Sequence, residues 1–375
     1  MRKAYKFRIY PTKKQKSAME QTLDICCELY NAALQERRDA YRIASISITY
    51  QDQQNQLPEI KKIRDDLKSV HSQVLQDVLK RLDNGMQAFF RRVKAGEKPG
   101  FPRFRSRSRY NSLTYAQSGF TFDNGKLALS KIGHIKIKLH RRIEGTIKTC
   151  ALTRSATGKW YACFSCEIEP TLLAVSAVAT GADAGLNALL TLSDGSKIEA
   201  PEFFRQEEKA LAKEQRKLSE LPKGSKERKQ QRKVVARVHE RITNKRTNYA
   251  HQLSHCLILV YGIIIFENLT IKNMLKNHCL AKSIADAAWK QIVRYTIYKA
   301  EYAGRYVGLV DPRFTSQDCH RCHNRRTDLK LSDRVYHCTN PECLLQIDRD
   351  HNAALNILAL GLQSVGYRAI EAASL

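Results

Sequence analysis

The stretch "AVATGADAGLNALLTLSDGSKIEAP" (residues 177–201) contains three short apolar or alternating runs separated by turn residues. We expect three consecutive β-strands here, with Asp194 and Gly195 forming the second turn. Asp183 stands in the first run between two glycines, which allow backbone to approach closely. No basic residue is its sequence neighbour, so its carboxylate is either an ordinary turn residue or a functional group.

Elements of both kinds follow this stretch. Residues 205–246 carry 15 basic and six acidic residues and predict a charged helical hairpin, broken at Pro222 and Gly224. The run "LILVYGIIIF" (257–266) predicts a buried strand that ends at Glu267. A helix over 284–303, a strand "RYVGLVDP" and a final helix after Asp350 complete an α/β core.

The N-terminal half has a different pattern of apolar and charged residues. "KAYKFRIYP" (3–11) alternates as a strand does, and residues 13–43 and 58–94 carry helical periodicity. Breaks between Gly96 and Pro102 end that pattern, and residues 101–170 predict short antiparallel strands. The chain of 375 residues therefore predicts a multidomain α/β protein.

The formal net charge is +27, which points to a polyanionic partner because binding phosphates releases counterions. A membrane surface could also attract this charge, but the longest apolar run is about half a spanning helix. The N-terminus has no apolar signal region, so we expect a cytoplasmic protein, bacterial or archaeal and associated with the nucleoid. Disulfides are rare there, and clustered cysteines indicate metal binding.

Four cysteines have the spacing of a zinc ribbon: Cys319, Cys322, Cys338 and Cys343. Two thiolates on each knuckle can hold one structural Zn²⁺ tetrahedrally. His320, His323 and His337 are rival ligands. Cys163 and Cys166 also spell C-x-x-C, but they lie in an alternating strand that would send them to opposite faces, so we interpret them as core residues.

Three acids mark the ends of predicted core elements: Asp183, Glu267 and Asp350. Taken singly, each is as easily a turn residue, a strand-end cap or a helix N-cap. Taken together in so basic a protein, they favour a site for two Mg²⁺ ions, which prefer carboxylate oxygens and suit phosphodiester hydrolysis.

Several motifs occur in an order that resembles transposon-encoded TnpB proteins, which look like ancestors of type V CRISPR effectors. They are "FRIYPTKKQ", "GFPRFRSR", "GADAGLNALLTLSDG", "IIIFENLTIKNM", "FTSQDCHRCHN" and "DRDHNAALNI". The resemblance implies an RNA-guided DNA endonuclease with a RuvC-like (RNase H-like) core and an inserted zinc ribbon. It implies that Asp183, Glu267 and Asp350 are the catalytic, Mg²⁺-binding residues.

The resemblance also implies domain boundaries. Residues 1–12 and 102–172 would form a wedge β-barrel, and residues 13–101 a helical recognition lobe. Residues 173–316 and 347–375 would form the nuclease, and residues 317–346 the zinc ribbon. The implied partners are a guide RNA from the protein's own element and a double-stranded DNA target, with no membrane and no small-molecule substrate. The alternative is a non-cleaving, RNA-guided repressor or regulator of transposition.

Six residues are candidates for nucleic-acid contact. Tyr50, Gln76 and Gln117 lie where such proteins would read a short motif beside the target, although each is as easily an ordinary surface residue. In "FPRFRSRSR" the arginines alternate, and as a strand this segment would present one basic face to phosphates, with Arg103, Arg105 and Arg107 as the candidates.

The last of the motifs contains two acids, Asp348 and Asp350, around Arg349. We expect Asp350, which stands at the start of the final helix, to hold the metal. We expect Asp348 to support it or to pair with Arg349. In that helix Ala354, Ile357, Leu358 and Leu362 should face the core, and Gly361 on the same face weakens the prediction for its last turn.

Overall fold

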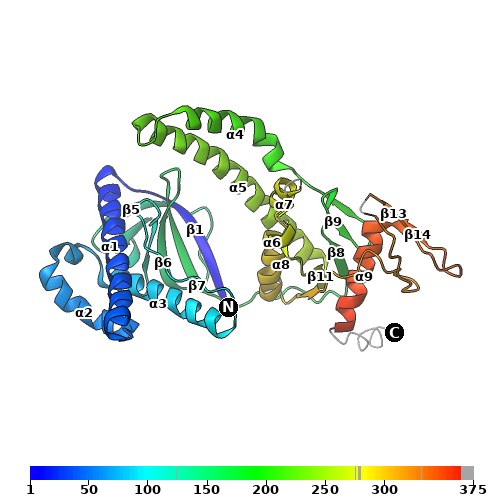
Figure 1. The fold of residues 1–375 in the computed structure, drawn as a ribbon, viewed down its shortest axis with the longest axis horizontal. Helices are drawn as coiled ribbons and strands as arrows, with labels where there is room; N and C mark the ends of the chain where they lie inside the picture. The colour runs from blue at the N-terminus through cyan, green and yellow to red at the C-terminus, as the bar shows by residue number, and fades with distance from the viewer. Residues whose placement is uncertain (124, 275, 278–279, 331, 365–375) are drawn as a thin grey trace. The chain divides into compact units, whose positions relative to one another are not determined.

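The computed structural model describes residues 1–123, 125–274, 276–277, 280–330 and 332–364. The chain divides into two compact units, Met1–Glu169 and Pro170–Leu375. Each unit contains its own sheet and helices (Figure 1). Among the described residues we find no helix with the length and apolar character that crossing a bilayer requires.

The first unit contains one seven-stranded antiparallel sheet in the order β2-β6-β7-β1-β5-β4-β3. Phe120 and Phe122 on β3 contact Phe164 on β7, although β1, β5 and β4 lie between these strands in the sheet order. The sheet therefore curls into a nearly closed barrel filled by aromatic side chains. Its strands are β1 (Arg2–Tyr10), β2 (Ser112–Tyr115), β3 (Phe120–Asp123), β4 (Lys126–Leu129), β5 (Gly133–Lys138), β6 (Thr146–Arg154) and β7 (Trp160–Glu167).

The helices of the first unit are α1 (Lys13–Ala44), α2 (Tyr50–Ile63), the short 3₁₀ helix η1 (Asp65–Ser69) and α3 (Ser72–Lys94). The helix α1 begins where Thr12 and Gln15 form a capping box, directly after Pro11. The helical pattern predicted over 58–94 is interrupted after Ile63, where η1 and the buried side chains of Leu67 and Val70 separate α2 from α3.

The segment 101–109 is not the strand that its alternating arginines predict, because it has no ladder partner. Its backbone is bound to α1 instead. The Asn31 amide donates to the Arg105 carbonyl at 2.8 Å, and the Arg105 N–H donates to the Asn31 amide oxygen at 2.8 Å. Side-chain hydrogen bonds thus replace strand pairing in this segment.

The second unit contains a five-stranded sheet in the order β10-β9-β8-β11-β12. β8, β11 and β12 are parallel, whereas β9 and β10 run antiparallel to their neighbours. A separate hairpin pairs β13 with β14. The strands are β8 (Ala179–Asp183), β9 (Ala188–Leu192), β10 (Lys197–Glu199), β11 (Ile263–Glu267), β12 (Tyr306–Val310), β13 (Val335–His337) and β14 (Gln346–Asp348).

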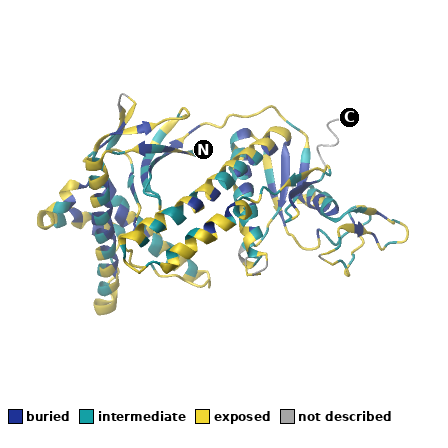
Figure 2. Ribbon diagram, turned by 90° about the horizontal axis from the view of Figure 1, so that it is seen from above, coloured by how far each residue is buried: buried dark blue, intermediate teal, exposed yellow. Residues whose placement is uncertain are grey.

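The helices of this unit are α4 (Phe203–Glu220), α5 (Lys226–Val260), α6 (Ile271–Met274), α7 (Ala281–Ala287), α8 (Trp289–Ala303) and α9 (Arg349–Ser364). α4 and α5 form the expected basic hairpin and are largely exposed (Figure 2). The prediction that the whole of 257–266 is a strand is wrong. Residues 257–260 end α5, and the strand begins at Ile263 after Tyr261 and Gly262.

The sheet of the second unit is covered on both faces. Ile264 and Phe266 of β11 pack into a core with residues of α5 and α8, whereas Ile263 and Ile265 pack against Ile357 of α9. Alternate residues of one strand thus face opposite layers, as period-two geometry requires. The sequence prediction that Ala354, Ile357, Leu358 and Leu362 face the core is confirmed.

Candidate functional site

Two of the candidate acids lie at the same edge of the second unit's sheet. Asp183 is the last residue of β8 and Glu267 is the last residue of β11. These strands are parallel neighbours, and Ala182 and Phe266, one residue earlier, are register partners. Because parallel strands end at the same side of a sheet, the two carboxylates are neighbours.

The third acid reaches this edge on α9, and glycines allow the helix to lie close to the sheet. A Cβ at Gly181 of β8 would lie 2.2 Å from the Ala354 carbonyl oxygen of α9. A Cβ at Gly361 of α9 would lie 2.4 Å from Ile265 Cγ1 of β11. Both contacts are too short for any side chain, so glycine at these positions sets the position of the helix that carries Asp350.

The three acids share one electrostatic environment. Burial, together with the negative charges of Glu267 and Asp350, raises the pKa of Asp183 to about 8. Burial also raises the pKa of Glu267. Within the described residues, the ligand atoms of the four cysteines all lie within 4.8 Å of one another. The carboxylate oxygens of the three acids, taken together, are more widely spaced than this.

The two acids of the final motif have separate roles. Asp348 Oδ1 accepts from the N–H groups of Asp350 and His351 at 3.0 Å each, so Asp348 caps α9. The alternative that Asp350 is the N-cap is therefore wrong. Arg349 forms an ion pair with Asp350, with 3.1 Å between Nη2 and Oδ1. Asp348 pairs instead with Lys197, with 2.7 Å between Oδ2 and Nζ.

A residue that the sequence did not single out holds Glu267. Thr315 Oγ1 donates to Glu267 Oε1 at 2.6 Å, and Thr315 is only 3% exposed. The Asn356 amide of α9 donates to the carbonyl oxygens of Thr315 and Asp318 at 2.8 and 2.7 Å. A single network therefore joins the end of β11, the following loop and α9.

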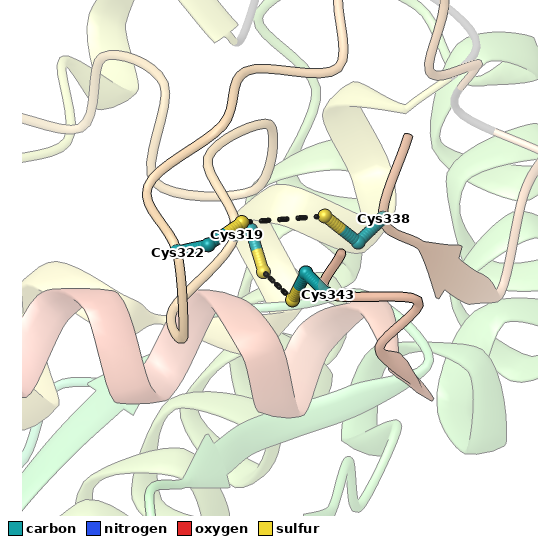
Figure 3. A group of neighbouring side chains, drawn as sticks. All are labelled: Cys319, Cys322, Cys338 and Cys343. Carbon is teal, nitrogen blue, oxygen red and sulfur yellow. Dashed lines mark hydrogen bonds between the residues drawn. The ribbon is translucent and has the colours of Figure 1, made fainter. Parts of the chain in front are cut away.

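The four cysteines form a compact thiol cluster, as Figure 3 shows. The Sγ atoms of Cys319 and Cys343 lie 3.8 Å apart, and those of Cys322 and Cys338 lie 3.4 Å apart. These separations match sulfurs around one tetrahedral ion with metal–sulfur bonds of about 2.3 Å. Hydrogen bonds from the Asn324 N–H and from the other three thiols lower the pKa of Cys322 to about 6, which favours the thiolate form that binds metal, whereas burial raises the pKa of Cys338 and Cys343. The cluster is therefore a zinc-ribbon-like site.

The rival ligands are not needed to complete this cluster. His320 Nδ1 lies 3.1 Å from Asn352 Oδ1, and His337 is exposed on β13. Asn352 of α9 also donates to the Asp318 carbonyl oxygen at 2.8 Å and accepts from the His320 N–H at 3.1 Å. The first knuckle is thus bound directly to the helix that carries Asp350.

The other C-x-x-C sequence forms no such cluster among the described residues. Cys166 is buried on β7, and Cys163 is on the opposite face of that strand with intermediate exposure. The prediction that strand geometry separates these two thiols is confirmed.

Tyr50 of α2 and Gln117, which follows β2, both contact side chains of α3, the helix that carries Gln76. Lys80 Nζ lies 4.8 Å from the ring centre of Tyr50, and Gln76 stands one turn earlier on the same helix. Gln73, a further turn back, accepts from the Gln117 N–H at 2.9 Å. The sequence did not identify Gln73 or Lys80, because the i, i+3, i+7 face of α3 becomes a site only when neighbouring elements pack on it.

The candidate arginines separate into two groups. Arg103 and Arg105 line a groove together with Arg109. Arg107 does not line it, and its guanidinium pairs with Glu28 at 2.5 Å. Without strand geometry, the alternating arginines do not share one face.

Three family models match the chain. OrfB_IS605, described as a probable transposase, matches residues 164–278, and the Cas12f1-like TNB domain matches residues 289–357. The first match contains Asp183 and Glu267, and the second contains the four cysteines and Asp350. The third, a helix-turn-helix domain, matches residues 1–43, where the structure has one strand and one long helix.

Relatives align over nearly the whole chain. A protein of Streptomyces pristinaespiralis named "Putative RNA-guided DNA endonuclease" is 36% identical, over 96% of this chain and 90% of its own. A protein of Escherichia coli K12 named "Putative RNA-guided DNA endonuclease InsQ" is 31% identical, over 96% and 92%. A CRISPR-Cas12f ternary complex aligns with 91% of this chain and 81% of its own, at 13% identity and a TM-score of 0.38. On the identity and coverage of these relatives, the chain belongs to the OrfB_IS605/TnpB family, which is related to Cas12f.

Proposed function

We propose that the protein is an RNA-guided DNA endonuclease that hydrolyses phosphodiester bonds at the edge of the sheet in its second unit. The observation that carries this proposal is the gathering of Asp183, Glu267 and Asp350 from two strand ends and one helix start. The net charge of +27 suits nucleic-acid partners, and relatives at 36% and 31% identity are named for this activity.

The sheet order supports a nuclease core of the RuvC-like, RNase H-like kind. Three antiparallel strands, β10, β9 and β8, lead to the parallel strands β11 and β12, and acids stand where β8 and β11 end. Ligands of mixed α/β sheets bind at the carboxyl ends of parallel strands. We assign this core to residues 173–316 and 347–375, with the zinc ribbon over 317–346.

The three acids fit a Mg²⁺ site, because hard divalent cations prefer carboxylate oxygens, and because burial and the charges of the two neighbouring acids raise the pKa of Asp183. Asp183, Glu267 and Asp350 would hold two ions, which when bound activate water and stabilise charge on the phosphate. The chain itself supplies Thr315, which orients Glu267, and Arg349, which balances Asp350.

The four-cysteine cluster would hold one Zn²⁺ with a structural role, since four thiolates leave no position for a substrate. Its proposed task is to fix the loop after β12 and the start of α9. The contacts of Asn352 and Asn356 with that loop support this assignment.

The proposed partners are a guide RNA from the protein's own element and a double-stranded DNA target. Base pairing would read the target, and the protein would read a short motif beside it. We assign that reading to Gln76 on α3 and to Tyr50 and Gln117, which contact Lys80 and Gln73 on the same face of that helix. The wedge would comprise 1–12 and 102–172, and the recognition lobe 13–101.

The test is cleavage of a plasmid library with randomised flanks by the protein co-purified with its RNA, with and without Mg²⁺. We expect Mg²⁺-dependent cuts beside one enriched flank, abolished by Asp183→Ala, Glu267→Ala or Asp350→Ala while RNA and target binding persist. Target binding without cutting by the wild type would instead favour an RNA-guided repressor or regulator of transposition.

A further inference from the structure

The first unit contains an arginine-lined groove of about 400 Å³ between α1, α3 and the segment 100–112. Five arginines line it, and no lining residue is acidic: Arg81 and Arg92 come from α3, and Arg103, Arg105 and Arg109 come from the irregular segment. Like charges gathered around one hollow repel one another, so this arrangement costs free energy unless an anion occupies it.

Most of this charge is not neutralised by other described residues of the chain. Arg81 pairs with Asp77 at 2.6 Å and donates to Ser112 and Thr114, so it holds the wall of the groove. No ion pair in the described part of the chain involves Arg92, Arg103, Arg105 or Arg109. The guanidinium of Arg105 instead stacks on the Tyr30 ring at 5.9 Å, which leaves its N–H groups open to a ligand.

Contacts with α1 and α3 hold the backbone of the irregular segment at Arg105 and Pro102. The Asn31 side chain forms two hydrogen bonds with the backbone of Arg105, and Cys27 Sγ also donates to the Arg105 carbonyl at 3.2 Å. A Cβ at Gly85 of α3 would lie 3.5 Å from Pro102 Cγ, so the segment lies directly against this helix. A fixed backbone lowers the entropy lost when a ligand orders the groove.

A buried polar group points to the same place. Tyr110 lines the groove and is 7% exposed, and its hydroxyl has no hydrogen-bond partner among the described residues. A buried hydroxyl without a partner is unfavourable, and a bound water or ligand group that reached it would offset this cost.

We propose that this groove binds the phosphodiester backbone of a nucleic acid, with Arg92, Arg103, Arg105 and Arg109 contacting phosphate oxygens. The fork of each guanidinium matches a phosphate, and contacts of this kind position a strand without reading its sequence. This inference rests on the proposed function only for the kind of ligand. The groove is separate from the Tyr50, Gln76 and Gln117 face, none of which lines it.

The test is affinity for the co-purified RNA and, separately, for a short DNA duplex, each measured over a range of salt concentrations. Log affinity falls as log salt concentration rises, and each lost phosphate contact makes this negative slope less steep by about 0.7–0.9. For one of the two ligands, RNA or DNA, we expect Arg103→Ala and Arg109→Ala each to reduce the steepness of the slope by about 0.7–0.9. The double variant should lower it by about 1.6 and weaken binding roughly tenfold at moderate salt.

Arg107→Ala is the matched comparison, because it removes the same charge from the same segment but from a side chain that pairs with Glu28 outside the groove. We expect its slope to change by clearly less than that of either groove variant. Loss confined to RNA, or confined to DNA, identifies which backbone occupies the groove. Unchanged binding of both ligands by the double variant, or an equal loss in Arg107→Ala, overturns the proposal.

Cleavage is assayed in parallel on the same preparations. A wild type that never cuts, with groove variants that lose binding, would remove the proposed function and leave the groove assignment standing. If the wild type cuts and the groove variants bind normally, the proposed function stands and the groove assignment is overturned.

Discussion

The Thr315 hydroxyl donates a 2.6 Å hydrogen bond to the Glu267 carboxylate, across 48 residues of sequence. The Thr315 carbonyl accepts from Asn356 on α9, so one buried threonine links the end of β11 to the helix that carries Asp350. Partners behind a metal ligand fix its orientation, and their loss typically costs 10–100-fold in metal affinity or activity.

Thr315→Val should therefore weaken the use of Mg²⁺ with little effect on folding. Valine keeps the shape of threonine but cannot donate to Glu267. We expect single-turnover cleavage to fall about 10–100-fold and half-saturation to move to higher Mg²⁺ concentration, whereas Thr315→Ser restores both. Wild-type Mg²⁺ dependence in the valine variant would contradict this role.

Asp350→Ala and Asp348→Ala should differ in their effects on cleavage and on stability. Asp350→Ala removes a proposed metal ligand, so cleavage should disappear while RNA binding and thermal stability persist. Asp348→Ala removes the α9 cap, which should cost about 1 kcal/mol of stability and only part of the activity.

Asp348→Asn is the matched control for this pair, because asparagine also caps helices well but carries no charge for Lys197. It should recover most of the stability lost in Asp348→Ala. If Asp348→Ala were inactive at unchanged melting temperature, Asp348 and not only Asp350 would belong to the metal site.

Gly361→Ala should destabilise the second unit even though alanine favours helices by about 1 kcal/mol. The added methyl would meet Ile265 at 2.4–2.6 Å, and overpacking of this kind costs about 1–3 kcal/mol. Denaturant unfolding measures the difference. Gln363→Ala, at an exposed position of the same helix, should change stability by less than about 0.5 kcal/mol. A Gly361→Ala variant more stable than wild type would show that α9 can shift.

Gly361 also illustrates what sequence could and could not predict. In sequence it only weakens a helix, because the reason for a glycine lies in the strand it touches. Thr315 is similar: it lies in the motif "FTSQDCHRCHN", but nothing in that motif reveals that its hydroxyl binds Glu267, 48 residues away. The positions of the three acids at the ends of core elements were predictable, because sequence pattern reveals where such elements end.

The wrong expectations have a common physical cause. The apolar run 257–266 fits both a buried helix end and a buried strand, and only Gly262 and tertiary packing divide it. The alternation in 101–109 predicts a strand, but Asn31 satisfies the backbone of Arg105 and no neighbouring strand pairs with it. Local pattern does not determine which partner a backbone finds.

The cysteine cluster should hold one Zn²⁺ per chain, and its removal should affect the site on α9. A zinc-selective chelator frees the first knuckle, whose backbone binds Asn352, so we expect lower thermal stability and lost cleavage. Adding Mg²⁺ alone should not restore cleavage, whereas Zn²⁺ followed by Mg²⁺ should. By elemental analysis, Cys338→Ser should lose zinc. His337→Ala and Cys256→Ser, both at exposed positions, should keep one ion. Zinc retained by Cys338→Ser but lost by His337→Ala would make the histidine the fourth ligand and require the β13 knuckle to rearrange.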